Sequence, residues 1–243
     1  MKKSHTYFIL LIVATFFSSC QSLYFSQPQP KGVAPFTHMP AELQGNYLSL
    51  GEQGIGEEII YHVHQDGFTV FEEYEVEIPL DSLEAEDVKY ELRDSLIYIE
   101  DLPIEENGFP YKIEGDSIFF SFYRWDEQKL GMDLVISEDK GFYYLSTRNE
   151  DKEGWEVMQL ERLRNGDLAV WMVNPKEEET LLREVLGAVK IDEKNDGDWK
   201  ADPSKGKLRK YVKQGGFGEL ASFLHKLDEK DLPNLFSSLI EKH

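Results

Sequence analysis

A series of turn dipeptides at nearly regular intervals constrains the fold more than any other feature of this sequence. With Gly67, Asp94, Gly115, Gly141 and Gly166 as the turn tips, the intervals are 27, 21, 26 and 25 residues. Each interval has room for two strands of ordinary length and two connections. The segments between the tips are rich in apolar and aromatic residues, and stretches such as FTVF and MDLVIS alternate with a period of two. The pattern predicts antiparallel strands joined by hairpins.

The predicted fold class is mainly β (α+β). An earlier hairpin, NYLSLGEQGIGEEIIYHV, brings the total to about eleven strands in an antiparallel up-and-down meander. Such a meander hides its edges by curling, so we expect a barrel or a two-layer clam over residues 45–173. The segment LQGNYLSL resembles the Gly-X-aromatic motif that opens lipocalins, with Gly45 and Tyr47 at the matching positions and Tyr in place of the usual Trp. The resemblance implies a lipocalin-like architecture and transfers no ligand site.

The chain changes character at Asn174, where the sequence NPKEEETLLREVLGAV begins. An Asn N-cap, a proline at the first helical position and glutamates in the first turn predict a helix. Further on, apolar residues recur at helical spacing, and Pro233 begins a last predicted helix. The apolar residues of these two later helices are Leu220, Phe223, Leu224, Leu227, Leu235, Phe236, Leu239 and Ile240. Residues 174–243 are therefore expected to form a helical C-terminal appendage.

The N-terminus has the layout of a secretory signal peptide over residues 1–19. Lys2 and Lys3 precede an apolar run of 11 residues, Tyr7 to Phe17, which is too short to span a bilayer. The next residues, Phe17-Ser18-Ser19-Cys20, resemble the lipobox of bacterial lipoproteins. That resemblance implies cleavage before Cys20, a diacylglyceryl group on its sulfur and an acyl group, such as palmitate, on the new amine. The alternative is an ordinary secreted protein with a stray thiol. A lone cysteine forms no internal disulfide, however, and its position at the cleavage point favours lipid attachment.

The lipobox resemblance also implies a location. The chain would be attached to a membrane of the cell envelope through its N-terminal lipid, and two or three acyl chains are enough for stable attachment. Gln21 stands where an Asp retains lipoproteins at the inner membrane of enteric bacteria. Its presence permits sorting to the outer membrane, with the protein facing the periplasm.

The segment after the cysteine, residues 20–44, has the composition of a tether. It contains Pro28, Pro30, Pro35 and Pro40, and proline at this density disfavours helices and central strands. Within it, Leu23-Tyr24-Phe25 has two equally weighted interpretations. The aromatic rings suit the lipid headgroup region, and the same residues suit an edge strand of the folded domain.

Charge divides the chain into two parts. Residues 33–199 carry 40 Asp and Glu against 14 Lys and Arg, whereas residues 200–243 carry 6 against 9. A body this acidic excludes nucleic acid as a partner. The C-terminal basic residues could dock on anionic headgroups or on the acidic surface of the protein itself, and we favour the second. The cluster consists of Lys200, Lys205, Lys207, Arg209, Lys210 and Lys213.

The sequence offers few residues in patterns that carry chemistry. His62 and His64 lie on one face of a predicted strand, with Glu57, Glu58 and Asp66 near in sequence, and two histidines at this spacing can chelate zinc. We interpret them as outward polar residues before a turn, and we expect no metal. DEKNDGD (192–198) departs from a calcium loop at its third position, Lys194, and at its twelfth, Pro203.

No cofactor is expected. QGGFG lacks the remainder of a phosphate-binding loop, so it is predicted to end one element and start the next. The sequence has no Gly-X-Ser-X-Gly or His-Glu-X-X-His motif. No catalytic residue is therefore assigned, although a triad is defined in space and not by order.

Aromatic residues are dense in the predicted strands, most clearly in IFFSFYRW and GFYYLS. They fit a thick core with cross-strand pairs, and also a ligand cavity or a partner surface. Three function classes follow. The first is a non-catalytic envelope lipoprotein that binds or scaffolds an envelope protein partner. The second is a lipocalin-like carrier of an apolar ligand, and the third is an envelope hydrolase.

Overall fold

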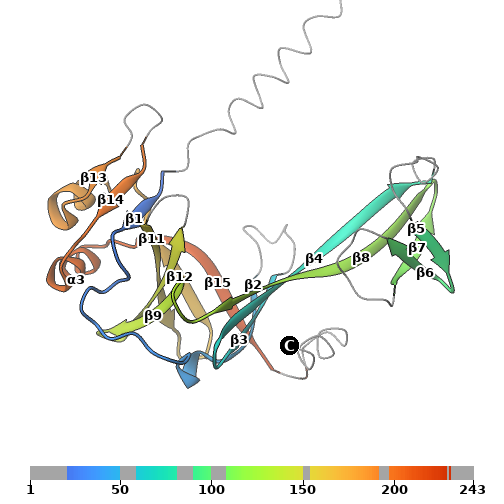
Figure 1. The fold of residues 1–243 in the computed structure, drawn as a ribbon, viewed down its shortest axis with the longest axis horizontal. Coiled ribbons are helices and arrows are strands. Elements are labelled where there is room, and N and C mark those ends of the chain that lie inside the picture. The colour runs from blue at the N-terminus through green and yellow to red at the C-terminus, as the bar shows by residue number, and fades with distance from the viewer. Residues whose placement is uncertain are drawn as a thin grey trace, which may run out of the picture. The chain divides into compact units, whose positions relative to one another are not determined.

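The computed structural model describes residues 21–49, 59–80, 90–99, 108–149, 154–191, 197–228 and 230. The predicted signal peptide, Cys20, residues 192–196 and the last predicted helix lie outside these ranges. Within them the chain is mainly β, as the sequence predicts, and it forms two compact units (Figure 1). None of the described helices has the length or the apolar character needed to cross a bilayer.

Unit 1 comprises residues 21–37, 130–164 and 168–221 of the described chain. Its sheet has the strand order β13-β14-β1-β11-β12, with β10 paired to β11 and β9 paired to β10. The strands are β1 (Leu23–Phe25), β9 (Leu134–Asp139), β10 (Phe142–Asn149), β11 (Gly154–Arg162), β12 (Leu168–Met172), β13 (Val189–Lys190) and β14 (Trp199–Ala201). Its helical elements are α2 (Glu179–Leu181), the π-helical turn η4 (Leu182–Leu186) and α3 (Lys205–Lys213).

The core of unit 1 joins the β1 side of the sheet to these helices. Phe25 and Trp199 from the strands are fully buried, as are Leu182 and Tyr211 from the helical elements. Ser204 caps α3 by accepting a hydrogen bond from the Lys207 backbone N–H, as the cap preferences of helices require. The apolar residues that predict a helix after Asn174 therefore do enter a helical segment, which ends at Gly187 in the left-handed conformation.

Unit 2 comprises residues 38–129, 165–167 and 222 onward. Its strand order is β15-β2-β3-β4-β8-β7-β6-β5. The strands are β2 (Gly45–Ser49), β3 (Ile59–His64), β4 (Gly67–Pro79), β5 (Tyr90–Arg93), β6 (Leu96–Ile99), β7 (Phe109–Glu114), β8 (Ser117–Lys129) and β15 (Glu219–Leu227), and a short 3-10 turn, η1 (Ala41–Leu43), precedes β2. The longest pairing joins β4 to β8 over 13 residues of each.

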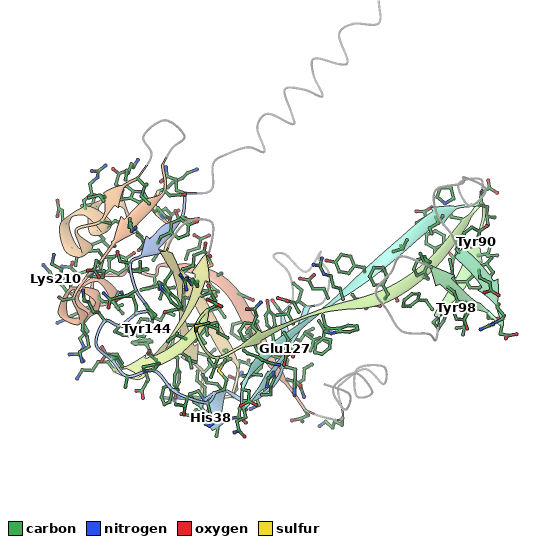
Figure 2. The ribbon with its side chains drawn as sticks, viewed as in Figure 1. His38, Tyr90, Tyr98, Glu127, Tyr144 and Lys210 are labelled. Atoms are coloured by element: carbon green, nitrogen blue, oxygen red, sulfur yellow. The ribbon has the colours of Figure 1, made fainter. Side chains whose placement is uncertain are left out.

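The core at the β5–β8 end of unit 2 is a separate apolar cluster. Ile97 and Ile118 are fully buried, and Phe120 is nearly so. Phe120 stacks with both Phe109 and Phe122, and the Phe109 and Phe122 rings are tilted to each other; the ring centroids are 5.8 to 6.4 Å apart. Figure 2 shows Tyr90 and Tyr98 at this end, on β5 and β6. Val76 and Ile78 of β4 pack on the same cluster, so alternate residues of β4 supply its apolar face.

The predicted hairpins are present. His64 pairs with Gly67, Arg93 with Leu96, Glu114 with Ser117, and Asp139 with Phe142, so each turn has two residues. Asp94 and Ser95, and likewise Lys140 and Gly141, adopt positive φ, the conformation of the tight hairpin turns that match strand twist.

Three predictions about the fold were wrong in detail. The described strands do not close into a barrel, because their order is open and has β13 and β5 at its two ends. Residues 219–227, predicted as a helix, form β15, in which Leu224 faces Ser49 and Leu227 faces Asn46. The described part of 174–243 is not a helical appendage, since it contributes three strands beside its short helices.

Residues 21–44 also differ from the predicted tether. Leu23, Tyr24 and Phe25 are all buried, and they form β1 between two neighbours, parallel β14 and antiparallel β11. The folded-domain interpretation of these residues is therefore confirmed, and β1 is internal where an edge strand was predicted.

Candidate functional site

The chain becomes part of unit 1 two residues after Cys20. The Ser22 backbone N–H donates to Asp198 Oδ1 at 3.1 Å, and the Trp199 N–H donates to the Ser22 carbonyl at 2.8 Å. Ser26 N–H donates to the Ala201 carbonyl at 3.0 Å. These bonds hold the backbone after Gln21 against β14.

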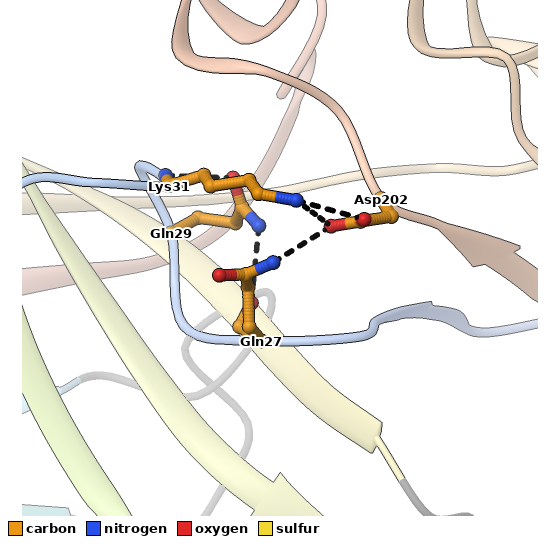
Figure 3. A network of polar contacts seen from close by, with 4 residues as sticks. All are labelled: Gln27, Gln29, Lys31 and Asp202. Carbon is orange, nitrogen blue, oxygen red and sulfur yellow. Dashed lines mark hydrogen bonds and ion pairs between the residues drawn. The ribbon is translucent and has the colours of Figure 1, made fainter.

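A polar network continues this attachment beyond β1 (Figure 3). Lys31 Nζ lies 2.9 Å from Asp202 Oδ2, and Gln27 Nε2 donates to Asp202 Oδ1 at 2.9 Å. Gln29 Nε2 donates to the Gln27 carbonyl, and Gln29 Oε1 accepts from the Lys31 N–H. The hydrogen bond from Lys31, and then that from Gln27, lowers the pKa of Asp202. The network holds residues 27–31 in place, although two of these five residues are prolines.

The predicted basic cluster lies mainly on α3. Arg209 donates from Nε and Nη2 to the two carboxylate oxygens of Asp139, at 2.6 and 2.5 Å. This pair lowers the pKa of Asp139, and the charges of Lys205 and Lys140 add to the effect. Lys207, Lys210 and Lys213 are exposed, and Lys205 is half-buried. Arg209 therefore folds back on the acidic part of the protein, while its neighbours on the helix face solvent.

His62 and His64, the two residues weighed as a zinc pair, do lie side by side on β3. Their rings are 5.6 Å apart and stacked, and His62 Nδ1 lies 2.7 Å from Asn46 Oδ1. Burial, and then the charge of His64, lowers the pKa of His62. Asp66 lies near His38 at 3.5 Å. The described residues contain no group of three or more potential metal ligands, and Glu57 and Glu58 lie outside them.

The glycine-rich segment QGGFG binds an internal anion. The backbone N–H groups of Phe217 and Gly218 donate to the Glu178 carboxylate at 3.2 and 3.0 Å, and the Tyr211 hydroxyl donates to the same group. The segment ends α3 and precedes β15, as predicted. Its resemblance to a phosphate loop is thus explained by a carboxylate of the same chain.

Sequence reasoning missed the feature of unit 2 that is best suited to binding, which is the long β4–β8 pair. Within the described residues, β3 borders β4 as far as Glu72, and β7 borders β8 from Ser117 to Phe120. From Ser121 to Lys129, β4 is the strand partner that the described residues provide for β8. The signal in the sequence was the length of these two strands relative to their neighbours.

The backbone groups of β8 have a defined direction along this stretch. Leu80 N–H donates to the Asp116 carbonyl at 2.7 Å, so the even-numbered residues of β8 bond to β4. The two-residue turn between Glu114 and Ser117 makes the odd-numbered residues bond to β7, because the residues flanking such a turn form a hydrogen-bonded pair. Beyond Phe120 the odd-numbered residues keep the same direction. We call their backbone groups, from Ser121 to Glu127, the outer edge of β8.

A groove lies where β7 separates from β8. It has a volume of about 370 Å³ and is lined by residues 75–76, 110–112 and 119–121. Its lining is mixed, with Phe119, Phe120 and Tyr111 beside the charged groups of Glu75 and Lys112. Ser121 belongs both to the groove and to the outer edge of β8.

The surroundings of this edge are strongly acidic. Residues 38–129 contain 23 Asp and Glu against 5 Lys and Arg. The described cations already have intramolecular partners: Lys112 pairs with Glu114, Lys129 with Glu127, Arg124 with Tyr74, and Arg93 with Tyr98. Figure 2 shows Glu127 on β8, at the end of the strand far from Tyr90 and Tyr98. Residues 38–129 therefore carry a large excess of negative charge.

Comparisons with known proteins assign no function to this arrangement. No protein-family model, no curated protein and no solved structure matches the chain. The functional conclusion consequently depends on the residues and their geometry alone.

Proposed function

We propose that this protein is a lipid-anchored cell-envelope lipoprotein without catalytic activity, which holds an envelope protein partner through unit 2. The observation that carries the binding role is the length of β8 beyond its pairing with β7. An exposed strand edge is usually shortened, covered or broken by a bulge. Among the described residues, no second strand pairs with β8 from Ser121 to Lys129, a stretch that begins at the groove.

The proposed attachment is the lipid on Cys20, at the outer membrane and facing the periplasm. The bonds of Ser22 to Asp198 and Trp199 support a particular consequence of it. Because one residue, Gln21, separates Cys20 from Ser22, the two Cα atoms are at most about 7 Å apart. Unit 1 would then stand at the membrane surface with no spacer.

Two other functions receive less support. The groove volume of about 370 Å³ is within the range of small-ligand sites, which favours the carrier of an apolar ligand. However, Glu75 and Lys112 line it, and the two cores are filled by packed side chains. The hydrolase would need a cluster around His62 and His64, and the described residues place no third ligand there.

The attachment is tested by labelling cells that express the full chain with a palmitate analogue. We expect the label on the wild-type protein, and Cys20→Ala should lose both the label and membrane association. Label that persists on Cys20→Ala would contradict the anchor.

The binding role is tested by a photo-crosslinking amino acid placed at Ser121 in intact envelopes. The matched control places it at Lys176, an exposed residue of unit 1. We expect a specific protein adduct from position 121 that is absent from position 176. Equal adducts at both positions, or co-purified lipid with no protein, would contradict a scaffold role.

A further inference from the structure

We infer that the outer edge of β8 accepts an extended, basic segment of the partner as an added β-strand. The inference rests on the proposed function, because it names the chemistry of the partner at the same surface. An added strand is bound by main-chain hydrogen bonds, and side chains on alternate residues supply the specificity. The relevant backbone groups are those of Ser121, Tyr123 and Glu127.

The position of β7 defines where the added strand would lie. β7 already occupies this side of β8 from Ser117 to Phe120. Its last residue paired with β8 is Tyr111, and the preceding residue, Pro110, pairs with Leu96 of β6. A segment on the outer edge of β8 would continue the line of β7 and would meet the groove at its end. Its hydrogen bonds would repeat about every 6.8 Å, the distance between alternate residues of a strand.

The outer edge of β8 is better suited to this than the outer edge of β4. From Ser121 to Lys129, β8 contains no proline. The stretch of β4 beyond β3 ends at Pro79, and proline protects an edge from pairing because it has no N–H to donate. β8 instead presents Arg124 to solvent beside half-buried Trp125 and Phe122, residue types that are enriched at binding hot spots or interfaces.

Charge identifies the kind of segment. A strand added to β8 would be separated from β4 by β8 alone. On β4, Glu72, Glu73 and Glu75 are the residues that pair with Arg124, Tyr123 and Ser121 of β8. With 23 acidic against 5 basic residues in 38–129, and with the described cations already paired, a partner gains by bringing Lys or Arg. Complementary charge raises the association rate and disfavours wrong partners. The occupant is therefore a basic segment of a protein.

The probe is a fluorescent peptide of about eight residues in which Lys alternates with Val and Thr, acetylated and amidated at its ends. We expect it to bind the full-length chain in detergent with a dissociation constant in the micromolar range, more weakly as salt increases. A matched peptide with Glu for every Lys should bind at least about tenfold more weakly. Fluorescence anisotropy measures both.

Two proline variants test the edge itself. Tyr123→Pro and Glu127→Pro each remove one N–H that points away from β4, so the β4–β8 pairing keeps its bonds. We expect each to weaken peptide binding about tenfold, the effect of one lost hydrogen bond. The matched control, Glu77→Pro, removes an outward N–H from the other edge of the same strand pair and should change affinity by less than about threefold. Circular dichroism verifies folding of each variant.

Two results would overturn the inference: equal weakening by Glu77→Pro and Tyr123→Pro, or no binding of the basic peptide to the wild type. If the β8 variants do not fold, the inference is tested on the wild-type protein with peptides that are N-methylated on alternate residues. Methylation in one register should abolish binding and in the other leave it intact, and indifference to register would contradict strand addition. If the peptide fails while the Ser121 crosslink persists, the scaffold function stands and strand addition is wrong.

Discussion

Tyr211 on α3 donates its hydroxyl hydrogen to the carboxylate of Glu178, which lies just before α2. The same carboxylate accepts the N–H groups of Phe217, Gly218 and Asn174, and both side chains are buried. Burial, and then the hydrogen bond to Glu178, raises the pKa of Tyr211, so the hydroxyl stays protonated as a donor. One buried carboxylate thus joins the start of the helical segment to the end of α3.

Replacing Glu178 should destabilise unit 1. We expect Glu178→Ala to lower the free energy of unfolding by about 3 kcal/mol, because several buried donors lose their acceptor. Glu178→Gln should cost about 1 to 2 kcal/mol, since one acceptor oxygen remains. Urea unfolding followed by circular dichroism measures both. The control is Glu177→Ala, an exposed neighbour, which should stay within about 0.5 kcal/mol; an equal loss there would contradict the role of the buried carboxylate.

The Asp139–Arg209 pair should make stability depend on acid. The pKa of Asp139 is lowered in the folded state, so its stabilising effect is present above the ordinary aspartate pKa of about 3.9 and is lost as pH falls through the lower folded value. Arg209→Met should lower the stability near neutral pH and lower it less at about pH 3. Lys210→Met, on the exposed neighbouring residue, should cost little at either pH. Urea unfolding at the two pH values measures this, and a pH-independent loss would contradict it.

The Lys31–Asp202 ion pair should contribute little to stability, although its geometry resembles that of the Asp139–Arg209 pair. Its side chains are 42% and 47% exposed, and exposed pairs contribute about 0 to 1 kcal/mol. Lys31→Met should therefore lower the melting temperature slightly. Phe25→Ala, in the same N-terminal segment and fully buried, should cost about 3 to 5 kcal/mol. If the two variants proved equally destabilising, the attachment of this segment would depend on the polar network and not on the buried strand.

His62 should lose protons more readily than a free histidine. Its pKa is lowered in the fold by burial and then by His64, so the fold favours the neutral ring. The stabilising effect is full above the ordinary pKa of about 6.5 and declines as pH falls below it. His62→Gln should therefore flatten the fall in stability between about pH 7.5 and pH 5. In a nuclear magnetic resonance titration, His64→Gln should move the pKa of His62 upward, and no movement would contradict the coupling.

Gly67, the first residue of β4, should resist any side chain. A Cβ there would lie 1.9 Å from the Gln128 carbonyl oxygen of β8, so the two strands would have to separate. Gly67→Ala should cost at least about 2 kcal/mol, with the loss seen by hydrogen exchange in β4 and β8. Gly131→Ala, where a Cβ meets nothing within 4 Å, should be nearly neutral. Similar losses for both would show that close approach of the strands is not the cause.

The hairpins could be predicted because each depends on residues that are adjacent in sequence. Lys140-Gly141 and Asp94-Ser95 supply positive φ at a two-residue turn, and alternation on both sides marks the strands. Asn174 does cap a turn, since its Oδ1 accepts the Lys176 and Glu177 N–H groups. The predicted helix start was wrong, because α2 begins only at Glu179. The two histidines of β3 could also be placed on one face, because strand periodicity alone determines that.

The errors occurred where a distant partner decided the conformation. Leu220, Phe223, Leu224 and Leu227 have helical spacing, yet β2 lies at a sequence distance of about 175 residues and pairs with this segment as a strand. Phe223 and Leu220 remain 44% and 46% exposed, so the apolar pattern in the sequence did not correspond to buried side chains. Glu178 was read as one of several first-turn acids, and nothing local showed that four donors would converge on it.

The sequence by itself determined that the chain is mainly β, where its turns fall and how its charge is divided, because these properties depend on local conformation and composition. It also contains the lipobox-like segment on which the proposed anchor depends. Only the tertiary structure decided that Leu23-Tyr24-Phe25 is a buried internal strand, that Arg209 pairs with Asp139, and that β8 extends beyond β7. Each of these depends on which distant segments become neighbours, and that choice is made by the packing of the whole chain, which no local pattern encodes.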